Sequence, residues 1–152
     1  MNQSKKLFNL MAMLTVAAMF ALVGCDKNST DPDNPADALI GTWKHTSLMV
    51  YYGSSVANAD SSTNMTADFG SFVLTFNADL TGMSVSTEGD STETDNFTYT
   101  ATATEITVTE DGETEVIPYE LSGNTLTLTI HEAADAEFEQ PEGWIVITLA
   151  KQ

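Results

Sequence analysis

The sequence is poor in positive charge and in the residues that build metal sites and disulfides. It contains no arginine, and five lysines stand against 22 acidic residues. Nucleic-acid-binding proteins contact phosphates with clustered lysine and arginine, so a nucleic-acid partner is excluded. The only cysteine cannot form a disulfide within the chain. His45 and His131 are the only histidines, too few alone for a zinc site of three or four ligands. No metal or cofactor is predicted.

The length and the apolar content indicate one folded domain. The chain has 152 residues, of which 42% are hydrophobic. This length suits a single domain, and this apolar fraction is too high for a disordered acidic tail.

Residues 1–24 have the three parts of a secretory signal peptide. Lys5 and Lys6 give a positive start, and the segment from Leu7 to Val23 is almost entirely apolar. Gly24 then precedes Cys25. The apolar segment is short for a membrane span, which needs about 20 residues, and a small residue at its end is typical of a cleavage site. Cleavage before Cys25 would leave three lysines and 22 acidic residues, a net charge of −19.

The end of this segment, Leu22-Val23-Gly24-Cys25, resembles the lipobox of bacterial lipoproteins. The resemblance implies a lipid on the Cys25 sulfur, N-acylation of the new terminus with a fatty acid such as palmitate, and a membrane partner through these chains. It also implies a location in the cell envelope, with the outer membrane favoured over the inner one. Asp26 leaves two readings open, because an acidic residue there resembles an inner-membrane retention signal in enteric bacteria and accompanies surface export in other groups. An ordinary signal peptide before an unmodified cysteine is the other alternative.

Residues 25–38 are predicted to form the lipidated cysteine and a flexible acidic tether. The stretch 26–38 contains two prolines and no leucine, isoleucine, valine or aromatic residue, so it has little with which to form a core. The folded domain is therefore predicted over residues 39–152.

The remainder of the chain has the period of β-strands and no convincing helical period. Apolar and threonine residues alternate, as in Leu126-Thr127-Leu128-Thr129, and this alternation is typical of antiparallel strands with one solvated face. Asp111-Gly112 is a strong two-residue hairpin signal. The predicted strands are 41–52, 69–77, 82–88, 96–103, 105–110, 113–121, 124–131 and 143–150. Residues 53–68 and 132–142 are predicted to be long loops, either lids or plain insertions.

Eight sequential strands with mostly short turns predict an all-β fold, an antiparallel up-and-down barrel. Closure removes exposed sheet edges. An eight-stranded barrel is either filled by its own side chains or holds one small ligand. The sequence leaves both alternatives open.

Several motifs resemble lipocalins and small bacterial lipocalin-like lipoproteins, which are calycins. Gly41-Thr42-Trp43 is similar to the Gly-x-Trp signature of the first lipocalin strand. The hairpin segments 76–82 and 119–129 and the strand 144–149 are similar to later parts of these barrels. The resemblance implies that Trp43 plugs one end of the barrel. The arginine that packs over this tryptophan in the family is missing, and Lys151 is the residue that could replace it.

The predicted lumen residues are the large apolar side chains that alternate inward. They are Phe72, Leu74, Phe76, Tyr99 and Tyr119. The acidic clusters at the turns are predicted to be solvated surface. We therefore predict a membrane-anchored lipocalin-like barrel, not an enzyme, that binds a small apolar or amphipathic molecule. The alternative is a side-chain-filled barrel that serves as a structural or protein-interaction module of the envelope, with a protein partner that the sequence does not name.

Overall fold

The computed structural model describes residues 34–133 and 142–152. The predicted signal peptide, Cys25 and most of the predicted tether lie outside these residues. Within the described part of the chain, no helix combines the length and the hydropathy needed to cross a bilayer.

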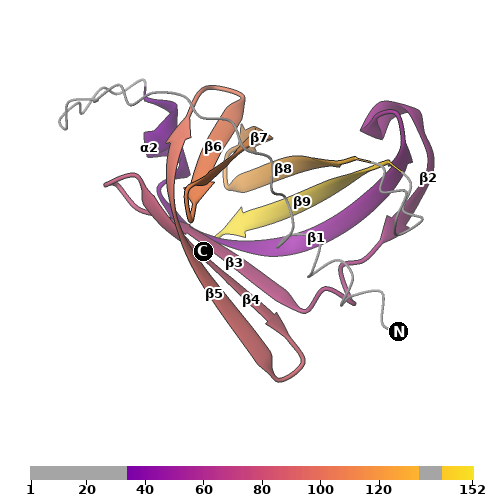
Figure 1. The fold of residues 1–152 in the computed structure, drawn as a ribbon, viewed down its shortest axis with the longest axis horizontal. Helices are drawn as coiled ribbons and strands as arrows, with labels where there is room; N and C mark the ends of the chain where they lie inside the picture. The colour runs from indigo at the N-terminus through magenta and orange to yellow at the C-terminus, as the bar shows by residue number, and fades with distance from the viewer. Residues whose placement is uncertain (1–33, 134–141) are drawn as a thin grey trace.

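The described residues form one antiparallel sheet that closes on itself (Figure 1). Its strands are β1 (Gly41–Gly53), β2 (Ala59–Asn64), β3 (Ser71–Phe76), β4 (Thr81–Glu88), β5 (Ser91–Ala101), β6 (Glu105–Glu110), β7 (Glu113–Ser122), β8 (Thr125–Glu132) and β9 (Gly143–Lys151). Each strand from β3 to β8 pairs with the next one along the chain, and β1 pairs with both β3 and β9. The predicted eight-stranded up-and-down barrel is confirmed, and its ladder closes entirely within residues 41–151.

Strand β2 is additional to the eight predicted strands and lies in a segment that was predicted to be a loop. It pairs with the second half of β1, where Met49 lies opposite Asn64, and a short 3-10 turn, η1 (Val56–Asn58), precedes it. The prediction of a loop over 53–68 was wrong at this point. The six residues of β2 are nearly all polar and exposed, so they carry no apolar alternation, and only pairing with the edge of β1 defines the strand.

A short helix, α2 (Pro35–Leu39), precedes the barrel. The Asn34 side chain accepts a hydrogen bond from the amide of Ala36, and Pro35 occupies the first turn, as is favourable at a helix start. Ala36 and Leu39 are buried. The folded part therefore begins before residue 39, because Ala36 and Leu39 give this short segment an apolar face.

The hairpin turns agree with the sequence in one case and differ in another. Asp111 and Gly112 both have positive φ, 48° and 87°, which matches the predicted two-residue turn. The β4–β5 hairpin is also tight, with Glu88 paired to Ser91. Strand β5 thus begins five residues earlier than predicted. The prediction missed this start because the first residues of the strand alternate threonine with acidic side chains instead of apolar ones.

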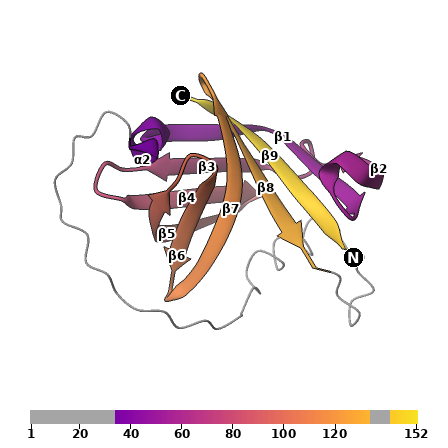
Figure 2. The ribbon, with the colours of Figure 1, turned by 90° about the horizontal axis from the view of Figure 1, so that it is seen from above.

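The barrel is continuous at one end and divided at the other. Strands β5 and β6 pair only from Thr98 to Ala101, and β7 and β8 pair only over the four residues next to their turn. Beyond these short ladders the strands diverge, as Figure 2 shows for β7 and β8. We call the end with α2 and the short ladders the closed end, and the opposite end, with the β4–β5 and β6–β7 hairpin tips, the mouth.

Candidate binding site in the barrel lumen

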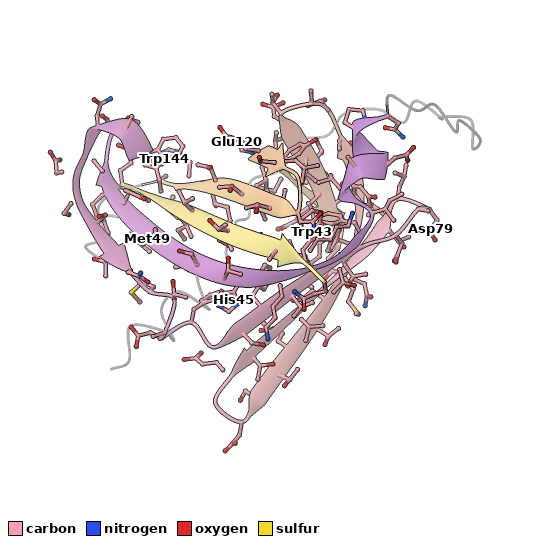
Figure 3. All side chains as sticks on the ribbon, turned by 180° about the vertical axis from the view of Figure 1, so that it is seen from behind. Trp43, His45, Met49, Asp79, Glu120 and Trp144 are labelled. Atoms are coloured by element: carbon pink, nitrogen blue, oxygen red, sulfur yellow. The ribbon has the colours of Figure 1, made fainter. Side chains whose placement is uncertain are left out.

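Trp43 seals the closed end. Its exposed fraction is 0%, and its indole Nε1 donates a hydrogen bond to the carbonyl of Leu39 in α2 at 2.7 Å. The Lys151 ammonium lies 5.0 Å from the centre of the indole ring, a cation–π contact. Figure 3 shows Trp43 beside the C-terminal end of β9, where the resemblance to lipocalins places the plug. The closed end is therefore a solid floor.

An aromatic cluster stands above this floor. The ring centres of Phe76 and Tyr99 are 4.9 Å apart, and those of Phe76 and Phe97 are 5.8 Å apart. The Tyr99 hydroxyl donates to the carbonyl of Asn77 at 3.0 Å, and burial, with the nearby charges of Asp37 and Asp79, raises the pKa of Tyr99 to about 12. Tyr99 is therefore neutral, and its proton is already engaged.

All five predicted lumen residues point into the barrel and are buried. Phe72, Leu74, Phe76, Tyr99 and Tyr119 are each at most 7% exposed. The Tyr119 hydroxyl donates to the carbonyl of Thr102 at 2.8 Å. These side chains belong to one buried core cluster with Trp43. Phe76, Tyr99 and Tyr119 lie toward the closed end, whereas Phe72 lies near the mouth end of β3, opposite Ser86. Their contact with a ligand stays a prediction.

A second set of inward residues forms a half-buried apolar wall nearer the mouth. Val108 lies opposite Tyr99, Ile117 opposite Ile106 and Ile130 opposite Ile145. Each packs against the core without being covered by it. The prediction of lumen residues missed this wall because it followed the aromatic residues. Ile106 and Val108 are two residues apart on one strand and therefore face the same side of the sheet, and this spacing is the sequence signal for the wall.

Nearer the mouth, the inward-facing positions of the same strands are occupied by acidic side chains. Asp95 lies opposite Ser84, Glu115 opposite Val108 and Glu132 opposite Gly143. Glu93 and Glu110 share the same parity. They were predicted to be ordinary solvated surface. They are in contact with solvent, but their strand register directs them into the mouth.

Comparison with known families agrees with this architecture. The model of a family described as a lipocalin-like domain matches residues 39–128, from the last residue of α2 to the middle of β8. This chain belongs to the lipocalin-like domain family. No curated protein matches the chain. The match covers the signature around Trp43 and most strands of the closed lipocalin-like barrel.

The carboxylates of the lipocalin-like mouth influence one another. Burial raises the pKa of Glu110, and the charges of Asp95, Asp111 and Glu93 raise it further. Burial also raises the pKa of Glu115, although this side chain is exposed to solvent. Burial and the charge of Glu115 raise the pKa of Glu132, against an opposing effect of His131.

These shifts predict how stability depends on pH. Since folding raises the pKa of Glu110, Glu115 and Glu132 above the usual 4.5, the folded state binds protons more tightly than the unfolded state. Their contribution to stability is therefore present below pH 4.5 and is lost as the pH rises through the folded-state values. Urea unfolding at stepped pH should show this decline, and the double variant Glu115→Gln, Glu132→Gln should flatten it. An unchanged profile in that variant would contradict the assignment.

The two histidines are engaged in structural contacts. Nδ1 of His45 accepts a hydrogen bond from the amide of Phe72 at 2.9 Å. Nε2 of His131 lies 2.8 Å from Oε1 of Glu142, and its ring packs 4.4 Å from that of Trp144. Over residues 34–133 and 142–152, no three His, Cys, Asp or Glu side chains are grouped so that they could hold a metal ion.

A shallow depression of about 500 Å³ lies over β3, β4, β5 and β6. Its walls include the outward side chains Thr75, Met83 and Thr98. It is therefore a feature of the outer surface rather than of the lumen.

Proposed function

We propose that this lipocalin-like domain binds a small apolar or amphipathic molecule in the upper half of its lumen, by enclosure and without covalent chemistry. The observation that supports the proposal is the half-buried wall of Val108, Ile117 and Ile130, which faces inward above a sealed floor. Apolar surface removed from water contributes roughly 25 cal/mol per Å². A ligand that covers the three side chains gains this free energy.

The alternative is a filled barrel that serves as a structural or protein-interaction module. The buried aromatic cluster of the lower half fits that alternative. The wall favours binding, because inward apolar side chains in a completely filled barrel would be covered by their neighbours.

A matched pair of variants tests the lumen. Ile117 is inward and half-buried, and its neighbour Val116 is outward and 53% exposed. In the segment 26–152, which contains every strand of the barrel, we expect the neutral dye Nile red to bind and to fluoresce. Ile117→Asn should weaken its affinity about tenfold through the lost apolar contact, and Val116→Asn should leave it unchanged. Equal affinities in two folded variants, or no binding by the wild-type segment, would contradict the proposal.

The proposed location is the cell envelope, with an anchor formed by lipid on Cys25 at the outer membrane. The lipobox-like sequence supports this part of the proposal, and two or more acyl chains hold a protein stably where a single chain does not. Intact-protein mass spectrometry of the membrane-extracted protein should give a chain that begins at Cys25 and carries the lipid mass. An unmodified mature chain would contradict the anchor.

A further inference from the structure

The strands that form the mouth reverse the usual alternation of an antiparallel sheet. A sheet with one solvated face normally directs apolar residues inward and charged residues outward. In β5, Thr92 and Thr94 point outward while Glu93 and Asp95 point inward. In β7, the outward residue is the exposed Val116, and Glu115 points inward. Charges that served only solubility would be on the outer face, so their inward position indicates a role in the lumen.

No lysine in the described part of the chain pairs with the inward carboxylates, although His131 lowers the pKa of Glu132. The two lysines of this part are Lys44 and Lys151. Lys44 is exposed near the start of β1, at the closed end, and Lys151 lies over Trp43. The one ion pair among the described residues joins His131 and Glu142. Apart from the effect of His131 on Glu132, the negative charge of the mouth is therefore not neutralised by these side chains.

The carboxylates stand directly above the apolar wall. Val108 precedes Glu110, Glu115 precedes Ile117 and Ile130 precedes Glu132 by two residues on the same face of a strand. Two residues span about 7 Å along a strand. A molecule whose apolar body contacts one of these side chains can therefore reach the carboxylate on the same strand with a head group.

We infer that the ligand is an amphipathic organic cation, with an amine or ammonium head at the carboxylates of the mouth and an apolar body against Val108, Ile117 and Ile130. This inference rests on the proposed function and specifies its ligand class. The attraction of one cation to several carboxylates is strongest where protein limits the access of water. The same charges repel fatty acids and other anionic amphiphiles, so the mouth selects by charge sign.

Three probes with the same tail test the charge selectivity. The segment 26–152 is titrated calorimetrically with decyltrimethylammonium and decanoate below their micelle concentrations and with decanol below its solubility limit. Decyltrimethylammonium should bind at least tenfold more tightly than decanol, and decanoate more weakly than decanol. Added salt should weaken the binding of the cation, since these charges are partly solvated. Equal affinities for the three probes would overturn the inference and leave the proposed function standing. No binding of any probe would count against both.

A pair of charge-matched double variants locates the effect. Glu115→Gln, Glu132→Gln removes two inward charges at the mouth, and we expect it to lower the affinity for decyltrimethylammonium about tenfold and to leave that for decanol unchanged. Glu105→Gln, Glu120→Gln removes two charges from outward positions paired with Pro118 and Thr127, and it should have little effect. Equal losses in the two variants would mean that net charge alone attracts the probe and would overturn the inference.

Discussion

Trp43→Ala should lower the free energy of unfolding by about 3–5 kcal/mol. The substitution empties the floor of the barrel, because the exposed fraction of the indole is 0%. It also leaves the buried carbonyl of Leu39 without the hydrogen bond that it accepts at 2.7 Å. Both losses fall where α2, β1 and β9 meet, so the closed end loses its packing. Urea unfolding of the segment 26–152 measures this change.

The other tryptophan provides the control. Trp144 lies on the outer face near the start of β9 (Figure 3), partly exposed and packed on His131. Trp144→Ala removes the same side chain from a site that is only half covered, and it should cost about 1–2 kcal/mol. Comparable losses at the two positions would contradict the role of Trp43 as the plug.

Gly82→Ala is expected to be the other strongly destabilising change. A Cβ at this position would overlap two ring carbons of Phe97 and lie 2.9 Å from the carbonyl oxygen of Thr75. The backbone oxygen belongs to the β3–β4 ladder and cannot move without breaking it. Phe97 would have to leave its place beside Phe76, where the ring centres are 5.8 Å apart. We expect a loss of about 2–3 kcal/mol, the upper part of the range for an overpacked core.

Gly89→Ala separates this steric effect from the general cost of replacing glycine. Gly89 is at the tip of the β4–β5 hairpin, and a Cβ there meets nothing within 4 Å. Its φ of 58° makes the substitution unfavourable by roughly 1 kcal/mol. A smaller effect at Gly82 than at Gly89, measured by thermal unfolding of both variants, would show that the aromatic cluster is not tightly packed.

The barrel could be predicted because its strands alternate apolar and threonine residues. Residues 125–130 give both the strand and its inward face in this way, and Asp111-Gly112 gives a hairpin. Strand β2 could not be predicted, because ADSSTN has no apolar face and is defined only by pairing with β1. The early start of β5 was missed for a related reason. The first inward residues of β5 are acidic, so this part of the strand lacks the apolar alternation by which strands are predicted.

The lower half of the lumen was easier to predict than the upper half. Phe76 and Tyr99 are large and aromatic, and such residues are usually buried. The wall and the carboxylates can be found by continuing the same two-residue alternation along each strand toward the mouth, from Tyr99 to Asp95 and from Tyr119 to Glu115. That extension requires the strands to continue to the mouth. The division of the mouth between β5 and β6 and between β7 and β8 depends on where the ladders stop, which no local sequence pattern indicates.

The central claim is that the lumen holds a small molecule, and native mass spectrometry tests it most directly. The segment 26–152 would be incubated with an extract of the cell envelope, repurified and measured under native and denaturing conditions. The account predicts a reproducible small-molecule adduct that disappears on denaturation. It also predicts that Ile117→Asn reduces the occupancy, whereas Val116→Asn does not. A clean apo mass for the folded segment under all these conditions would contradict the claim and would favour the filled barrel.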